Sequence, residues 1–116
     1  MATRTATVDN TTVHALLVTW SGLLNGDTGN AIEMPDWADR CIQVTGTFGA
    51  SGSVRFEGSL DGTNYFPLTD PQGNALNITA AGGEAVTEVT RYVRPNVTAG
   101  DGTTSLVLMM YARRNR

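Results

Sequence analysis

Few side chains in this sequence could act in catalysis, and their spacing matches no familiar catalytic arrangement. His14 is the single histidine, so it has no second histidine for a metal site, and no serine–histidine–aspartate order surrounds it. Cys41 is the single cysteine and stands between Arg40 and Ile42, where we expect a small buried apolar residue and not a nucleophile. We therefore predict that the protein is not an enzyme.

The carboxylates are scattered along the chain and favour turns over acid–base chemistry. Asp61, Asp70 and Asp101 each stand beside Gly or Pro, where aspartate commonly hydrogen-bonds to the local backbone. Residues 25–30 (NGDTGN) faintly resemble the start of a calcium-binding loop, but Asp36 occupies the twelfth position, which glutamate normally fills. We predict a plain surface loop there, and neither a metal nor a cofactor.

Length, charge and hydropathy limit the possible partners. A chain of 116 residues can bury its own core, so we predict a single β domain over residues 1–116. The formal net charge of −3 argues against nucleic acid, which needs a basic stripe, and no apolar run is long enough for a membrane span. The polar N-terminus lacks a secretory pattern, so we expect synthesis in a bacterial host cytoplasm.

Short β-prone runs separated by turn residues dominate the chain, and no helical apolar period of useful length is present. The fold class predicted is all-β, an antiparallel β-sandwich or jelly-roll-like barrel of about 7–9 short strands. The strands are expected at residues 13–20, 41–48, 53–60, 65–68, 75–79, 84–89, 91–97 and 104–112.

Two of these strands carry more specific predictions. Pro95 has no backbone N–H, so the strand at residues 91–97 should lie at a sheet edge or end there. Alternation in residues 53–60 predicts an inward set and an outward set, namely Val54, Phe56 and Leu60 inward and Arg55, Glu57 and Ser59 outward.

The last predicted strand is apolar on both faces. Leu106, Leu108 and Met110 alternate with a second apolar set, Val107, Met109 and Tyr111. A small sandwich has one interior, so the second set is covered either by another part of the chain or by another subunit.

The two ends of the chain are predicted to be extensions and not strands. Residues 1–12 form an N-terminal arm and residues 113–116 a basic C-terminal tail.

Several sequence blocks resemble a family of small phage proteins encoded near the major capsid protein. The blocks are TWSGLLNGD, MPDWADR, VTGTFG, VRFEGSLDGTNYFPLTDPQGNAL and TRYVRPNVTAGDGTTSLVLMMYARR, within residues 13–114. The resemblance implies a virion component on the capsid surface, a head decoration or cement protein that binds the major capsid protein and stabilises the head.

The predicted contact residues combine this resemblance with the apolar last strand and with the arginines. All eight basic residues are arginine, a side chain that suits protein interfaces better than lysine. We expect a homo-oligomer whose contacts include Arg4 in the arm, Val107, Met109 and Tyr111 in the last strand, and Arg113, Arg114 and Arg116 in the tail.

Two alternative functions remain open from the sequence. The segment EGSLDGTNYFPL is similar to a strand–turn–strand element of discoidin-like carbohydrate-binding sandwiches, which would make Trp37, Tyr65 and Phe66 candidates for stacking on a sugar. The other alternative keeps the protein structural but places it in the tail or neck of the particle.

Overall fold

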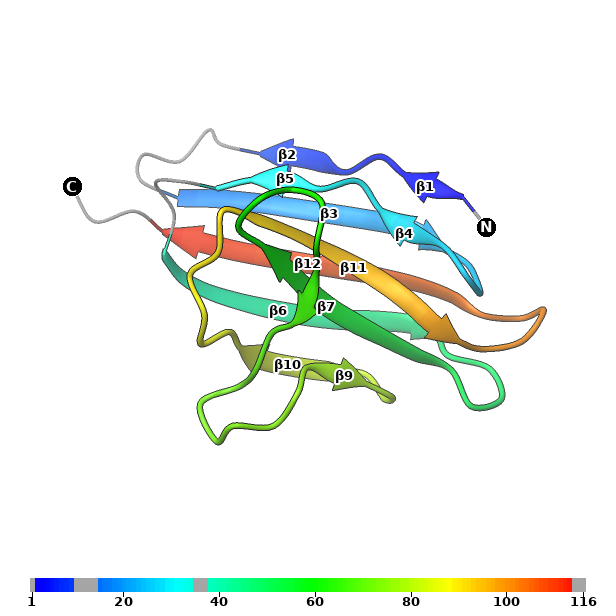
Figure 1. Cartoon of the computed structure of the whole chain (residues 1–116). Helices are drawn as coiled ribbons and strands as arrows, with labels where there is room; N and C mark the ends of the chain where they lie inside the picture. The colour runs from blue at the N-terminus through cyan, green and yellow to red at the C-terminus, as the bar shows by residue number, and fades with distance from the viewer. Residues whose placement is uncertain (1, 10–14, 35–37, 114–116) are drawn as a thin grey trace.

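The computed structural model describes residues 2–9, 15–34 and 38–113, and this part of the chain forms two β-sheets without a helix (Figure 1). The all-β prediction is confirmed. The strands are β1 (Thr3–Arg4), β2 (Thr7–Asp9), β3 (Ala15–Leu23), β4 (Thr28–Gly29), β5 (Ile32–Glu33), β6 (Ala38–Thr47), β7 (Ser53–Ser59), β8 (Phe66–Pro67), β9 (Asn77–Ile78), β10 (Gly82–Ala85), β11 (Tyr92–Ala99) and β12 (Ser105–Arg113).

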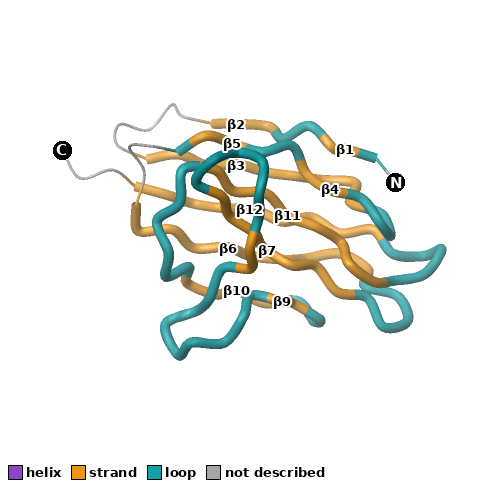
Figure 2. Tube along the Cα trace, in the orientation of Figure 1, coloured by secondary structure: helices purple, strands orange, loops and turns teal. Residues whose placement is uncertain are grey.

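Long strands form the body of each sheet, and short strands lie at the margins (Figure 2). One sheet, called sheet A, has the order β1-β4-β11-β7-β8, with β5 also paired to β11 and β9 to β7. The second, called sheet B, has the order β10-β6-β12-β3-β2. All strand pairs are antiparallel except β1 with β4 in the described chain.

Alternating apolar residues from both sheets meet in one core. Trp20 on β3 and Phe56 on β7 are fully buried, and their ring centroids lie 6.3 Å apart in an edge-to-face arrangement. The indole N–H of Trp20 donates to the backbone oxygen of Asn30 at 3.0 Å, so the burial of this polar atom is compensated. The other large core side chains are Leu23, Met34, Ile42, Leu68, Leu76, Leu106, Leu108 and Met110.

The N-terminal arm connects the margins of the two sheets. The sequence predicted an extension, but residues 3–4 pair with β4 in sheet A and residues 7–9 pair with β3 in sheet B. Between the two short strands, Ala6 packs against the core and its N–H donates to the side chain of Asn30 at 2.8 Å. The arm is therefore part of the sandwich.

Pro95 lies in an interior strand, so the edge prediction for residues 91–97 was wrong. β11 pairs with β7 on one side and with both β5 and β4 on the other. On that second side Val93 pairs with Ile32 and Asn96 pairs with Thr28, so Pro95 falls in the interval between the two short strands. A residue without an N–H is tolerated there because no ladder bond is required of it.

Candidate functional site

The outer face of sheet B is an uncovered and partly apolar surface of the described chain. β12 lies in the centre of the sheet, between β6 and β3, and its residues alternate between the two faces. Leu106, Leu108 and Met110 point into the core and are completely buried. The opposite set consists of half-buried Val107 and Met109 and of Tyr111, which is 46% exposed.

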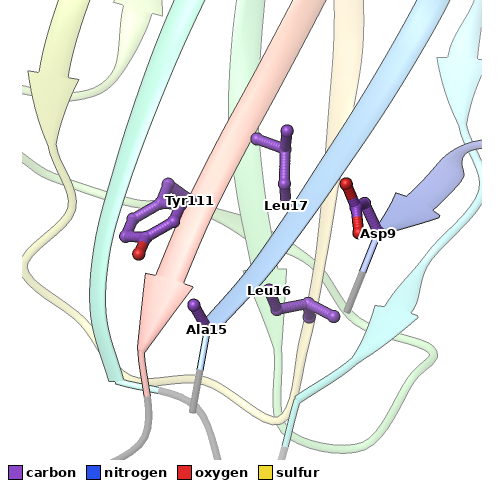
Figure 3. Close-up of a pocket in the computed structure, with 5 residues that line it drawn as sticks. All are labelled: Asp9, Ala15, Leu16, Leu17 and Tyr111. Atoms are coloured by element: carbon purple, nitrogen blue, oxygen red, sulfur yellow. The ribbon is translucent and has the colours of Figure 1, made fainter. Parts of the chain in front are cut away.

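The register of sheet B places these residues in rows across the face. Tyr111 pairs with Leu17 of β3 on one side and with Cys41 of β6 on the other. Figure 3 shows Tyr111 and Leu17 on neighbouring strands, with Asp9 of β2 beyond Leu17. We call this surface the B face, and it comprises Leu17, Thr19, Cys41, Gln43, Thr45, Val107, Met109 and Tyr111.

Two shallow hollows flank the ring of Tyr111. One, of about 120 Å³, is lined by Asp9, Ala15, Leu16, Leu17 and Tyr111 (Figure 3). The other, of about 140 Å³, is lined by Leu17, Cys41, Ile42, Gln43, Met109 and Tyr111. Both hollows are open, and Leu17 and Tyr111 form the ridge between them. The surface of the B face therefore has one protruding ring, that of Tyr111, with a hollow on each side of it.

Cys41 is exposed on the B face, so the prediction of a buried cysteine was wrong. Its neighbour Ile42 points into the core, and adjacent residues of a strand point to opposite faces. The Cys41 side chain therefore lies on the outer face of sheet B. Its apolar neighbours there include Tyr111 and Met109, which line the same hollow as Cys41.

Charged side chains lie at the rim of the B face and not in its centre. Arg113, at the end of β12, donates to the carboxylate of Asp39 at 3.3 Å, and the two side chains are 62% and 66% exposed. An exposed ion pair of this kind contributes little to stability. Arg113 is therefore held loosely near the face that carries Val107, Met109 and Tyr111.

Arg4, another predicted contact residue, lies on the margin of sheet A and is bound within the chain. Its Nε donates to the carboxylate of Asp27 at 2.7 Å, and the N–H groups of Ala2 and Leu24 donate to the same carboxylate at 3.0 and 2.9 Å. Burial alone would raise the pKa of Asp27, but the bonds from Leu24, Arg4 and Ala2 outweigh it and lower the pKa. The Arg4 guanidinium thus anchors the arm.

Residues 25–30 are not the plain surface loop that was predicted, because Asp27 is buried and Thr28–Gly29 form β4 between β1 and β11. All three of the bonds to Asp27 satisfy donors of the surrounding chain, and the carboxylate is 4% exposed. In the part of the chain that the structure describes, no group of three or more histidine, cysteine, aspartate or glutamate side chains is arranged to hold a metal ion. The described residues likewise contain no helix long and apolar enough to cross a membrane.

A polar cluster on the outer face of sheet A was missed by the sequence analysis. Glu57 was predicted to face solvent, but its side chain is 1% exposed. Its carboxylate accepts from Arg94 Nε at 3.0 Å, from Arg55 Nε at 2.7 Å and from the Asn96 amide at 3.1 Å, with a further ion pair to the Arg55 terminal nitrogen. We call these four residues the Glu57 cluster.

The electrostatics of this cluster keep Glu57 ionised. Burial by itself would raise the pKa of Glu57, but the hydrogen bonds from Asn96, Arg55 and Arg94 more than compensate and lower it. The sequence signal that could have found the cluster is the Arg-x-Glu spacing of Arg55 and Glu57, which puts both side chains on one face of the strand predicted at residues 53–60. A second signal is Arg94 in the strand predicted at residues 91–97.

Two further predictions for the strand at residues 53–60 were wrong. Ser59 was predicted outward and is fully buried, whereas Leu60, predicted inward, is 64% exposed.

The candidate sugar-binding residues lie beside this cluster, on the sheet A side. The ring of Tyr65 stacks against the guanidinium of Arg94, with 3.7 Å from the guanidinium carbon to the ring centroid. Phe66 of β8 is 40% exposed. One face of Tyr65 is therefore occupied by the protein's own arginine. Trp37, Arg114 and Arg116, which the sequence analysis also singled out, lie outside the described residues, as does His14.

Comparisons with known proteins identify the fold but no family. No family model matches the sequence, and no curated protein matches it either. Among solved structures, the crystal structure of SPBc2 prophage-derived protein YomS matches with a TM-score of 0.64 and 8% sequence identity. The match covers 90% of this chain and 98% of that chain. The two proteins therefore share a fold over nearly their whole lengths.

Proposed function

We propose that this protein is a structural component of a phage particle that decorates the capsid by binding the lattice of the major capsid protein. The observation that carries the proposal is the B face, an uncharged and partly apolar surface in the centre of a sheet. Contiguous apolar surface exposed in this way is typical of protein–protein contacts. The sequence blocks that resemble phage structural proteins support the same conclusion, and YomS, which shares the fold, is described as prophage-derived.

The mechanism requires only modest affinity at each contact. Apolar contacts, with the shell or between copies of the protein, would come from Val107, Met109 and Tyr111, and arginines would pair with acidic groups of the shell. Because a capsid repeats its surface many times, a protein linked into an oligomer gains avidity without any new contact. Many such copies would together resist the loss of subunits from the shell, which is the stabilisation expected of a cement protein.

Co-sedimentation tests the proposal directly. Purified protein is mixed with capsids of its own phage that lack it, before and after shell expansion, and the pellet is quantified. We expect saturable binding, a stoichiometry that matches the lattice, and slower loss of capsid integrity on heating. Absence of binding to both forms of the shell would contradict the proposal and favour the tail or neck, where ring symmetry of the purified oligomer would be the diagnostic feature.

The carbohydrate alternative can be tested separately. If the surface around Tyr65 and Phe66 bound a sugar by stacking, Tyr65→Ala would abolish binding on a glycan array while leaving capsid binding intact. The contact between Tyr65 and Arg94 weighs against this alternative, because a sugar would have to use the remaining face of the ring or displace the guanidinium. A blank array with the wild-type protein would eliminate the alternative.

A further inference from the structure

We infer that the B face binds a second copy of this chain about a two-fold axis. The inference rests on the proposed function only in treating the B face as a protein-binding surface. In the dimer Val107, Met109 and Tyr111 contact the second copy, so contact with the shell falls to the arginines outside the B face. Three features of the described residues support the inference: the charge of the face, its relief, and its position relative to the rest of the sandwich.

The charge distribution favours a copy of the same chain over a strongly charged partner. The eight residues of the B face are all uncharged, and the charged side chains on the same side of sheet B, Asp9 beside Leu17 and Arg113 beyond Tyr111, lie at its margins. A partner with a basic or acidic surface would find nothing to pair with in the centre of this face. A second copy brings the same neutral centre, so the two centres meet without like-charge repulsion, and Thr19, Gln43 and Thr45 supply both donors and acceptors.

The relief of the face is self-complementary. A two-fold interface requires each surface to carry both the protrusion and the depression that receives it. Tyr111 provides the protrusion, and the hollow of about 140 Å³ beside it provides the depression. That volume is several times the roughly 15 Å³ that one water molecule needs, so the hollow is large enough to admit part of a side chain.

The B face is also the barer of the two outer faces. On sheet A, the loop between β7 and β8 arches over the strands (Figure 1). A Cβ on Gly62 would lie 3.2 Å from the ring of Tyr92, and Tyr65 of the same excursion stacks on Arg94. No equivalent excursion of the described chain covers the B face, on which Tyr111 is 46% exposed.

The size of the face sets the strength of the dimer. β3, β6 and β12 contain 9, 10 and 9 residues. With a rise of about 3.3 Å per residue and a strand spacing of about 4.8 Å, these strands and the short marginal ones present about 550 Å² per copy. Two copies would bury about 1,100 Å², which is at the lower limit of specific interfaces. We therefore expect a dimer that dissociates on dilution.

Analytical ultracentrifugation over a concentration series tests the inference, with two variants. Tyr111→Arg replaces the protruding ring of the B face with a charge on both copies and should weaken dimerisation at least tenfold. Leu60→Arg is the matched control, because Leu60 is 64% exposed on the sheet A side and lies outside the B face. Circular dichroism melts confirm that both variants are folded. The single cysteine gives a second readout, since alkylation of Cys41 should be slow in the dimer and fast in Tyr111→Arg.

The outcomes separate this inference from the proposed function. A wild-type protein that stays monomeric up to about 1 mM overturns the dimer, as does equal weakening by Leu60→Arg and Tyr111→Arg. If such a monomer still co-sediments with capsids, the capsid role stands and only the occupant of the B face was wrong. If the wild type dimerises as expected but binds neither form of the shell, the dimer stands and the capsid role fails.

Discussion

Replacing Glu57 with glutamine should destabilise the fold although it changes only one group of atoms. The carboxylate accepts hydrogen bonds from two guanidiniums and one amide, and its side chain is 1% exposed. A glutamine keeps one acceptor oxygen and turns an NH₂ towards donors, so at least one charge-assisted bond is lost. Such a bond contributes about 1.5–3 kcal/mol. Because Arg55 and Arg94 stay 37% and 31% exposed and hydrated, we expect a loss of about 2 kcal/mol, near the lower end.

The pH dependence of this effect provides the decisive assay. The pKa of Glu57 is lower in the folded protein than its usual value of 4.5. The ionised carboxylate therefore contributes fully to the free energy of unfolding above pH 4.5, and this contribution is lost as the pH falls through the folded pKa. Urea unfolding of wild type and Glu57→Gln should therefore differ most at pH 7 and converge in acid, because the protonated acid resembles the amide. At pH 7 the loss corresponds to roughly 8 °C in Tm.

Glu84→Gln is the matched control for this experiment. Glu84 lies on β10, whose residues are all exposed, and its substitution should change the free energy of unfolding by less than about 0.5 kcal/mol. If Glu57→Gln changed stability no more than Glu84→Gln, or if its effect persisted unchanged in acid, the account of the Glu57 cluster would be refuted.

Three further predictions concern the arm, a strand glycine and a loop carboxylate. Asp27→Asn should loosen the arm by about 2 kcal/mol, seen as faster hydrogen exchange of the Thr28 and Asn30 amides, which donate to arm carbonyls, with β12 unaffected. Gly46→Ala should lower the free energy of unfolding in urea by at least about 2 kcal/mol, because the φ of Gly46 is 113° and a Cβ there would lie 2.4 Å from a backbone oxygen. Gly82→Ala, where a Cβ would have no atom within 4 Å, should be nearly neutral in the same assay. Bonds from the Thr103 hydroxyl and nearby N–H groups lower the pKa of Asp101 to about 2, so Asp101→Asn should flatten the acid dependence of stability between pH 4 and pH 2.

Alternation in the sequence correctly predicted the inward residues of β12 and, in β7, Val54 and Phe56. Leu106, Leu108 and Met110 are buried as the pattern of β12 requires, and the apolar set on its other face lies on the B face. The same alternation indicates Cys41 on the outer face, because Ile42 is inward. The prediction for Cys41 was wrong because it used the general preference of cysteine for burial and not the strand period.

Where the predictions for β7 and β11 failed, the cause was tertiary and not local. The outward position of Glu57 was correct, but its burial depends on Arg94 and Asn96 of β11, about 40 residues further along the chain. The position of Pro95 is acceptable only because β5 and β4 leave an interval beside it. Strands as short as β1 and β2 contain two and three residues, too few to establish a period.

The central place of β12 also governs the order in which the molecule can assemble. β12 follows every other strand in the sequence, yet it separates β6 from β3, which have no pairing with each other. Sheet B therefore cannot close until residues 105–113 have left the ribosome, and the chain must hold the apolar faces of β3 and β6 exposed until then. Such long-range closure is slow and invites aggregation. Nascent chains that stall before β12 are therefore expected to be substrates for chaperones or proteases.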